Sequence, residues 1–337
     1  MKARVSISVA TFLVVVGLAS LFPSHAQKTL SQPAQVETAN GAPPLANPLK
    51  VALLKWYKAN TVPTEFPVGQ GPEGLAFDGA NIWSANQDDG TVSKVRASDG
   101  ANLGTFSVGG SPIGIIFDGA NMWVTDLYGS EITKIRASDG KVVGRFTVGN
   151  GPYWGAFDGA NIWVTTGTPT GNGSVNKIRA RDGKIVGTFT VGNGPTAVAC
   201  DGPDIWVTNE GDATVTKLRA RDGVVLGTFS VGSAPLGIAF DGANMWVVNH
   251  FDGTVTKLRA SDGAVLGTFP ANVGAYDIAF DGTNIWVSSG TVLVELRASD
   301  GKGLAFLRDT GNALTGLAFD GANIWAGGFG RNTVGKF

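Results

Sequence analysis

The chain is poor in the two side chains that most often build metal centres and nucleophilic sites. It holds one cysteine, Cys200, and two histidines, His25 and His250, among 337 residues. A lone cysteine forms no intramolecular disulfide, and it excludes a cluster of zinc-bound thiolates. Two histidines far apart in sequence give little basis for a shared histidine metal site or a Ser-His-Asp set. The composition therefore argues against catalysis that depends on thiolates or on several histidines.

Positive charge is not in excess either. The chain has 26 Lys and Arg residues against 27 Asp and Glu residues, which gives a formal net charge of −1. Domains that bind nucleic acid usually carry a strongly basic face. We therefore predict no nucleic-acid partner.

Long apolar runs are missing except at the N-terminus. The run Val5–Phe22 follows the basic start Met1–Arg4 and precedes Ser24–Ala26, which places small residues where a signal peptidase requires them. We predict that residues 1–26 are a signal peptide and that the protein is exported, to the periplasm or out of the cell. An uncleaved membrane anchor is the alternative, because the run is close to the ~18 residues that a span needs. Without residues 1–26 the chain has no membrane span, and it holds 24 basic and 27 acidic residues.

What the sequence has in abundance is glycine and repetition. It contains 49 glycines, about twice the usual share of roughly 7%, which points to many tight turns. The aspartates of the repeated phrase FDGANIW and its near copies are spaced by 40, 40, 43, 40, 40 and 39 residues. A period near 40 with strand patterning indicates a radial or solenoid repeat. The seven copies begin at Phe77, Phe117, Phe157, Cys200, Phe240, Phe280 and Phe319.

The fifth copy predicts how each unit folds. Its β-branched and apolar stretches alternate with turn residues and show no helical period. Four antiparallel strands in each of seven units predict an all-β fold, a seven-bladed β-propeller with four-stranded blades. A linear β-solenoid is the rival, because the repeat period alone does not fix closure. The expected strands are Gly237–Asp241, Met245–Val248, Thr254–Ala260 and Val265–Phe269.

The two ends of the repeat region predict how the ring closes. The last unit ends in Thr333–Phe337, which matches a third strand and leaves the unit without a fourth. Near the other end, Glu65–Gly69 matches the fourth strand Thr105–Gly109 but has no unit before it. We expect this N-terminal strand to complete the last blade, because the pairing removes two open sheet edges.

These patterns divide the chain into three parts. Residues 1–26 form the signal peptide, residues 27–60 a tether rich in Ala and Pro, and residues 61–337 the propeller. Segments of this composition make extended linkers. Within the tether, Leu49, Leu53 and Trp56 have helical spacing, so a short helix over residues 49–57 could cap the ring.

The repeat VGxGPxGIAFDGANIWVTNxxDGTVTKLRASDGxVLGTFSVG resembles bacterial propeller repeats of the YVTN and NHL-like superfamily, which includes the streptogramin B lyase (virginiamycin B lyase) family. The resemblance covers about residues 61–337 and implies the seven-bladed ring. For the lyases it further implies histidines in the loops that enter the innermost strands of the last two blades, acidic help and a magnesium ion. The matching positions here are Tyr276 and Thr315, and the acidic position falls near Phe329. This chain therefore departs from the lyase pattern.

One rim of the ring varies from unit to unit. It is formed by the loops between blades and the loops between second and third strands, whereas the uniform DGAN and SDG turns form the other rim. Variable loops on a rigid scaffold are where a specific site is expected, and aromatic faces with carboxylates suit a sugar, a cation or a peptide. The candidate ligand-binding residues are Glu73, Asp126, Tyr153, Trp154, Glu210, His250, Tyr276 and Asp277.

The candidates also have structural interpretations. Tyr153, Trp154 and Tyr276 would fill the centre of the ring, and the aspartates would form turns. His250 would be an exposed loop residue. Cys200 takes the place of a phenylalanine in the other copies, which favours a buried thiol over a nucleophile.

We therefore predict an exported β-propeller that acts as a binding or scaffold module, with no catalytic residue assigned. Its partner would be a protein, a glycan or a small molecule that meets the variable rim. The alternative is a metal-dependent enzyme, lyase-like or lactonase-like, with a divalent ion at the channel mouth. Its ligands would be Asp126, Glu210 and Asp277, which come from non-adjacent blades. A purely architectural envelope protein is a third interpretation.

Overall fold

The computed structural model describes residues 64–167, 172–308 and 313–337. The expected signal peptide (1–26) and the expected tether with its short helix (27–60) lie outside these residues. The described part holds 28 β-strands and two 3-10 helices of three residues each. None of its helices has the length and apolarity that a membrane crossing requires.

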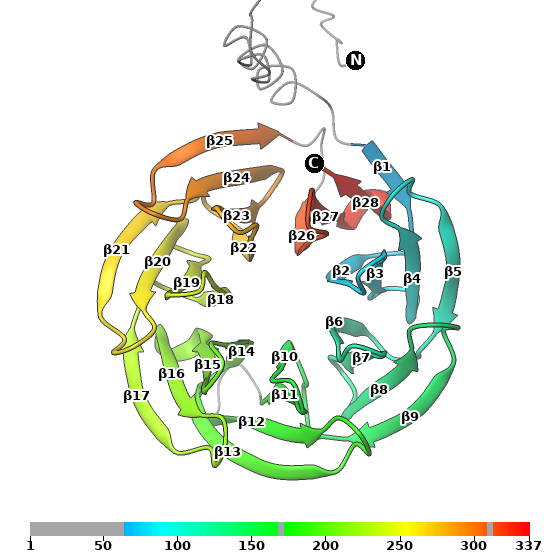
Figure 1. Cartoon of the computed structure of the whole chain (residues 1–337), viewed down its shortest axis with the longest axis horizontal. Helices are drawn as coiled ribbons and strands as arrows, with labels where there is room; N and C mark the ends of the chain where they lie inside the picture. Colours follow the sequence, from blue (N-terminus) through cyan, green and yellow to red (C-terminus); the bar gives the residue numbers. More distant parts are fainter. Residues whose placement is uncertain (1–63, 168–171, 309–312) are drawn as a thin grey trace, which may run out of the picture. The chain divides into compact units, whose positions relative to one another are not determined.

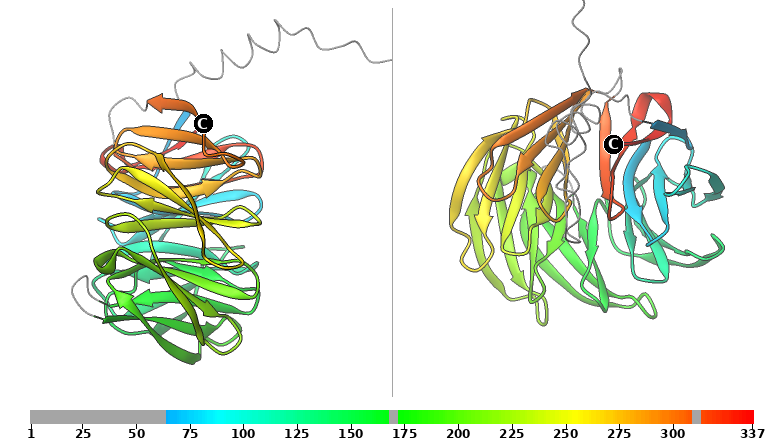
Figure 2. Two further views of the ribbon diagram at one scale, coloured as in Figure 1. Left: turned by 90° about the vertical axis from the view of Figure 1, so that its left-hand side faces the viewer. Right: turned by 45° about the horizontal axis from the view of Figure 1, so that its top comes forward.

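The strands form seven four-stranded antiparallel sheets arranged in a ring (Figure 1). Each sheet is one blade, and the innermost strands surround a central channel. In the side view of Figure 2 the strands run between two rims that carry the loops. The predicted all-β, seven-bladed propeller is confirmed, because the repeats close into a ring and do not stack into a solenoid.

The first four blades take their strands in chain order, from the channel outward. Blade 1 holds β2 (Pro72–Phe77), β3 (Asn81–Asn86), β4 (Thr91–Arg96) and β5 (Asn102–Ser107). Blade 2 holds β6 (Pro112–Phe117), β7 (Asn121–Asp126), β8 (Glu131–Arg136) and β9 (Val142–Thr147). Blade 3 holds β10 (Gly155–Phe157), β11 (Asn161–Thr166), β12 (Asn172–Arg179) and β13 (Ile185–Asn193). Blade 4 holds β14 (Pro195–Cys200), β15 (Asp204–Asn209), β16 (Thr214–Arg219) and β17 (Val225–Ser230), with the 3-10 helix η1 (Glu210–Asp212) after β15.

The remaining blades follow the same plan until the last. Blade 5 holds β18 (Pro235–Phe240), β19 (Asn244–Asn249), β20 (Thr254–Arg259) and β21 (Val265–Pro270), each within two residues of the expected bounds. Blade 6 holds β22 (Ala275–Phe280), β23 (Asn284–Ser289), β24 (Val292–Arg297) and β25 (Gly303–Arg308). Blade 7 holds β26 (Leu314–Phe319), β27 (Ile324–Gly328), β28 (Thr333–Lys336) and, as its outer strand, β1 (Thr64–Pro67), with the 3-10 helix η2 (Phe329–Arg331) after β27.

The outer strand of blade 7 comes from the other end of the chain. β1 pairs antiparallel with β28, so that Thr64 lies opposite Lys336 and Pro67 opposite Thr333. The ring of Phe66 packs on Trp325 with 5.5 Å between ring centroids. The pairing thus gives β28 the neighbour that every other third strand has within its own repeat.

The repeated phrase builds the turn between the first two strands of each blade. In blade 1, Asp78 accepts hydrogen bonds from the backbone N–H of Asn81 (2.7 Å) and from Nε1 of Trp83 (2.8 Å). Gly79 has φ +94°, a conformation that glycine adopts without strain. Burial would raise the pKa of Asp78, but the hydrogen bonds from Trp83, Asn81 and the backbone outweigh it and hold the pKa below its ordinary value. The same Asp–Trp bond recurs at Trp123, Trp163, Trp206, Trp246, Trp286 and Trp325.

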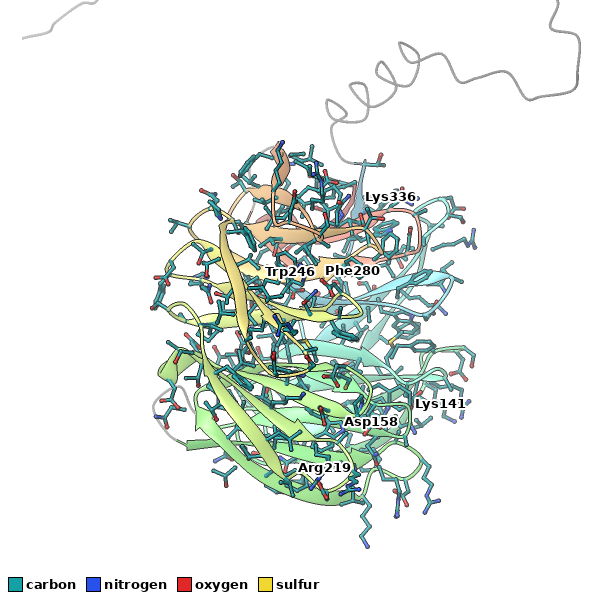
Figure 3. All side chains as sticks on the ribbon, turned by 60° about the vertical axis from the view of Figure 1, so that its left-hand side comes forward. Lys141, Asp158, Arg219, Trp246, Phe280 and Lys336 are labelled. Carbon is teal, nitrogen blue, oxygen red and sulfur yellow. The ribbon has the colours of Figure 1, made fainter. Side chains whose placement is uncertain are left out.

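In six of the seven blades a lysine on the third strand ties this turn to the next blade. The Nζ atom of Lys94 lies 5.0 Å from the ring centroid of Trp83 and donates a 2.7 Å hydrogen bond to the carbonyl of Ala137 in blade 2. We call this arrangement the lysine latch. Lys336, labelled in Figure 3, repeats it from blade 7 to the carbonyl of Ala97 in blade 1. The other latch lysines are Lys134, Lys177, Lys217 and Lys257.

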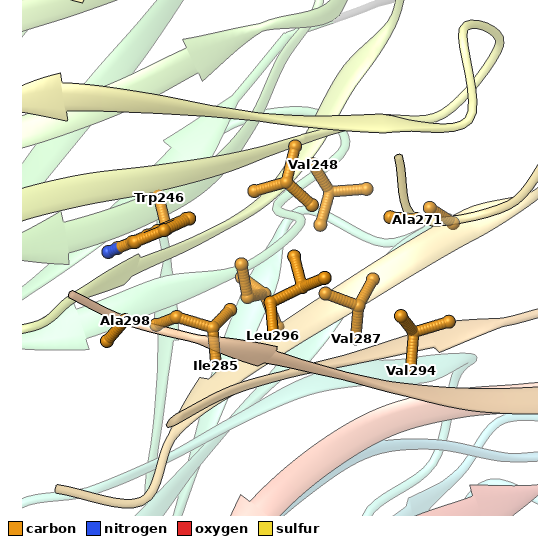
Figure 4. Packing of buried hydrophobic residues seen from close by; sticks show 11 residues of the cluster. Trp246, Val248, Ala271, Ile285, Val287, Val294, Leu296 and Ala298 are labelled. Atoms are coloured by element: carbon orange, nitrogen blue, oxygen red, sulfur yellow. The ribbon is translucent and has the colours of Figure 1, made fainter. Parts of the chain in front are cut away.

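The apolar core lies between neighbouring blades as a set of separate layers. Between blades 5 and 6, Trp246 and Val248 of one blade pack against Ile285 and Val287 of the other (Figure 4). Similar clusters fill the other boundaries between blades. The layers hold the blades rigidly around the channel, so loop residues at the channel mouth stand on a fixed frame.

Candidate functional site

The innermost strands approach one another closely at one level of the channel. A Cβ atom on Gly74 of β2 would lie 2.3 Å from the carbonyl oxygen of Ile113 in blade 2, so a larger side chain does not fit there. Five blades carry glycine or alanine at this level, and the exceptions are Trp154 and Asp277. Both exceptions line a cavity inside the channel, so the two larger side chains break the repeat at this cavity.

The cavity has a volume of about 170 Å³. It is lined by at least one residue from each of the seven innermost strands, and Asp277 is the one charged residue among them. A space of this size holds several water molecules or a small ligand group. The cavity is therefore the part of the channel that binding chemistry can use.

Three aromatic rings from opposite sides of the ring cross the channel. Trp154 meets Tyr153 and Tyr276 in edge-to-face contacts, with 5.3 and 5.2 Å between ring centroids. The hydroxyl of Tyr276 donates a 3.0 Å hydrogen bond to Oε2 of Glu73, and the hydroxyl of Tyr153 also interacts with that of Tyr276. Residues of blades 1, 3 and 6 thus meet near the axis. We call Glu73, Tyr153, Trp154, Tyr276 and Asp277 the channel cluster.

The backbone of blade 3 departs from the repeat around Trp154. Its innermost strand β10 has three residues, whereas the other six innermost strands have six each. The N–H of Trp154 hydrogen-bonds to the carbonyl of Thr196 in blade 4 (3.3 Å), and the N–H of Tyr153 to the carbonyl of Thr165 (3.1 Å). The strand therefore lacks part of its regular pairing at the point where Trp154 replaces the usual small residue.

Burial makes Glu73 a weak acid. Its side chain is 9% exposed. Burial raises the pKa of Glu73 to about 7, the hydrogen bond from Tyr276 lowers it in part, and the charges of Asp88 and Asp277 raise it again. At neutral pH the carboxyl group therefore exists in both protonation states and can give or take a proton.

The second carboxyl group of the channel cluster joins two blades. Oδ2 of Asp277 on β22 accepts a 2.7 Å hydrogen bond from the backbone N–H of Leu317 on β26. Burial nevertheless raises the pKa of Asp277 to about 6, against the effect of the N–H groups of Leu317 and Ile278. Burial also raises the pKa of Tyr276 well above its usual value, so this phenol stays a neutral donor.

The three other candidates lie outside the channel cluster. Glu210 of η1 borders it: burial raises the pKa of Tyr153, and the charges of Glu73 and Glu210 add to that effect. Asp126 ends β7, where Oδ1 accepts a 2.8 Å hydrogen bond from the N–H of Ser111 in the loop between blades. His250 is partly buried, and its Nδ1 lies 2.8 Å from the carbonyl oxygen of Ala275.

The residues present do not fit the metal that the resemblance implies. Asp126, Glu210 and Asp277 do not converge, and the described ranges hold no group of three His, Cys, Asp or Glu side chains placed to bind an ion. At the positions that correspond to the lyase histidines, Tyr276 donates to Glu73 and Thr315 donates a 2.7 Å hydrogen bond to the carbonyl of Pro72.

Sequence reasoning missed a set of hydroxyl groups that position the innermost strands. Oγ1 of Thr165 donates to the carbonyls of Trp154 (3.1 Å) and Thr196 (2.7 Å), which belong to neighbouring blades. Thr208 does the same for Ala197 and Leu236. The signal was a threonine two positions after the repeated tryptophan, and it could have been read as a contact between blades.

Several solved structures resemble the chain in fold. A streptogramin B lyase matches with a TM-score of 0.69 and 18% identity, over 81% of this chain and 96% of that one. A catalytically inactive virginiamycin B lyase from Staphylococcus aureus with quinupristin matches with 0.69 and 20%, over 81% and 97%. Hydrazine synthase from Kuenenia stuttgartiensis matches with 0.68 and 17%, over 83% and 98%. Likeness at these identities shows the fold alone. No model of a known protein family and no curated protein sequence matches the chain.

Proposed function

We propose that this chain is an exported β-propeller binding module whose channel cluster receives a small ligand with a cationic amine. The observation that carries the proposal is the pair of carboxyl groups in the channel, the buried Glu73 and the partly buried Asp277, beside three aromatic rings. The proposal of export rests on the N-terminal sequence of residues 1–26.

The electrostatics of the cluster favour a positive ligand. The charges that act on Glu73 belong to other acids, Asp88 and Asp277, and neither Glu73 nor Asp277 forms an ion pair with a described Lys or Arg residue. A buried carboxylate without a cationic partner costs several kcal/mol, and a cation that pairs with it offsets this cost. An ammonium group should therefore bind to the channel cluster more tightly than a neutral group of the same shape.

The aromatic residues supply the second half of such a site. A cation over an aromatic face is stabilised by about 0.5–2 kcal/mol, more where water is excluded. Trp154 is 9% exposed, and its edge-to-face contacts with Tyr153 and Tyr276 fix its orientation. The rings are thus held in place before a ligand arrives, which reduces the entropy lost on binding.

Calorimetric titration of the purified chain with choline tests the proposal. The neutral isostere 3,3-dimethylbutan-1-ol has the same shape without the charge, and we expect it to bind at least about tenfold more weakly. Glu73→Gln and Tyr276→Phe should weaken choline binding, whereas Glu131→Gln on β8, which makes the same chemical change outside the channel cluster, should not. Equal binding of choline and its isostere, or no binding of choline, methylammonium and putrescine, would refute the cationic ligand.

A further inference from the structure

Blade 6 lacks the lysine latch that the other six blades have. Glu295 on β24 stands opposite Trp286 in the strand pairing, as Lys94 stands opposite Trp83 in blade 1. A carboxylate has therefore replaced an ammonium at the boundary between blades 6 and 7. The replacement reverses the charge at a position that is otherwise constant.

The rest of the latch site is still present in blade 6. Nε1 of Trp286 donates a 2.7 Å hydrogen bond to Oδ2 of Asp281, as in every other blade. Nδ2 of Asn284 turns from the aspartate to Oε1 of Glu295 (2.8 Å). Burial raises the pKa of Glu295, and the charge of Asp281 adds to that effect. Two carboxyl groups thus share the site, and no described Lys or Arg residue faces them.

The greater exposure of Trp286 is consistent with a missing lysine at this site. The equivalent tryptophans of the six latched blades are fully buried, with 0% exposure. Trp286 is only partly buried, and none of the cation–ring contacts of the described residues involves it. Six copies of the site show what fits there: an Nζ atom 4.8 to 5.3 Å from the ring centroid.

The described chain begins close to this site, at Thr64 of β1. Thr64 lies opposite Lys336 in blade 7, and the next residue, Phe337, packs in the same apolar cluster as Trp286. The segment 49–63, which lies outside the described residues, carries three lysines and no acid. Lys58 precedes Thr64 by six residues, a stretch that spans up to ~20 Å when extended. The charge of the segment and the place where the described chain begins both suit the vacant site.

We infer that a lysine of the segment 49–63, Lys58 or Lys55, docks its ammonium group on the face of Trp286 between Asp281 and Glu295. The segment thus provides the lysine that blade 6 lacks. The contact connects the start of the propeller to the boundary between blades 6 and 7. This inference is independent of the ligand proposed for the channel.

Zero-length carbodiimide cross-linking of the purified full chain, followed by peptide mass mapping, tests the docking directly. We expect a cross-link within one chain from Lys58 or Lys55 to Glu295 or Asp281. The exposed Lys141 on blade 2 (Figure 3) serves as the matched lysine that should form no such cross-link. Absence of the cross-link, or a cross-link between two copies, would overturn the inference.

A pair of substitutions separates docking from mere proximity. Glu295→Lys places a latch lysine in blade 6 and should displace the segment, whereas Glu295→Gln adds no lysine and keeps Asp281, so the segment should stay docked. Trypsin should therefore cut after Lys55 and Lys58 about tenfold faster in Glu295→Lys than in Glu295→Gln, the ratio expected from loss of a contact worth about 1.4 kcal/mol. Equal cleavage rates in the two variants would show that the segment does not occupy the site.

Discussion

The carboxyl groups of the repeated turns and those of the channel respond to burial in opposite ways. Asp78 collects hydrogen bonds from Trp83, Asn81 and the backbone, and these outweigh burial and lower its pKa. Asp277 and Glu73 receive fewer hydrogen bonds and face other acids or a cavity, so burial raises their pKa to about 6 and about 7. The comparison separates the frame of repeated turns, whose aspartates each have several hydrogen-bond partners, from the channel, whose two carboxyl groups have fewer and no cationic partner among the described residues.

The largest expected difference concerns the tryptophans of the two regions. Trp83→Ala removes a side chain with 0% exposure that stacks on Phe106 and donates to Asp78, so we expect a loss of about 3–5 kcal/mol of unfolding free energy. Trp154→Ala should cost less than half as much, because the vacated space joins an existing cavity that water can fill. Urea denaturation of both variants measures the difference. Equal losses would mean that the channel is packed as tightly as the frame.

The frame could be predicted from the sequence because its contacts repeat. The motif FDGANIW and its near copies recur seven times with the Asp and Trp at the same spacing, as in Asp78 and Trp83. This recurrence predicts the turn, the strand order and the period in every blade. The channel could be predicted only in part. Repeat phase places Glu73 and Tyr276 on the same rim, but it does not reveal that two side chains 203 residues apart share a hydrogen bond.

The directions of individual side chains account for the features of the candidate site that the sequence did not predict. Asp126 has the phase of a rim residue, yet it turns to the loop and accepts the N–H of Ser111. Trp154 interrupts the pairing of β10, which no strand propensity indicates. Such choices depend on contacts with other blades, and a local pattern of residues does not contain them.

The two kinds of carboxyl group should give opposite pH dependences. Because the pKa of Glu73 is higher in the folded chain than in the unfolded one, the folded state binds the proton more tightly, and stability falls as pH rises from about 4.5 to about 7. At about 1.4 kcal/mol per unit of pKa, Glu73→Gln should remove a loss of roughly 3 kcal/mol and be more stable than the native chain at pH 8. Asp277 titrates in an overlapping window and should supply the remaining decline.

Asp78→Asn is the counterpart of Glu73→Gln in the frame. The lowered pKa of Asp78 stabilises the fold above its unfolded value of about 3.8, and this contribution is lost as pH falls through the folded pKa. Asp78→Asn should therefore destabilise the chain at pH 7 and have less effect near pH 3. Unfolding measured by circular dichroism from pH 3 to 8 tests both signs, and a parallel response of the two variants would contradict the comparison.

A smaller effect is expected for the latch. Lys94→Met keeps the aliphatic contact with Trp83 but loses the cation–ring contact and the hydrogen bond to Ala137, which together are worth about 2 kcal/mol. The same substitution at the latch position of blade 6, Glu295→Met, removes a half-buried carboxylate but leaves Asp281 to hold a docked lysine, so it should cost less than Lys94→Met. Urea midpoints of the two variants test this contrast, and equal destabilisation would show that Glu295 is a structural partner in its own right.

The smallest effect is expected at Asp126, the candidate at the end of β7 whose carboxylate accepts a hydrogen bond from the loop between blades. At the same position of blade 5, Asn249 accepts a 3.0 Å hydrogen bond from the N–H of Gly232, so an amide oxygen can do what Oδ1 of Asp126 does for Ser111. Asp126→Asn should therefore change the unfolding free energy by less than about 0.5 kcal/mol and leave choline binding unchanged, while Glu73→Gln weakens it. Calorimetry on both variants assigns Asp126 to the frame, and a loss of choline affinity in Asp126→Asn would instead place this carboxylate in the binding site.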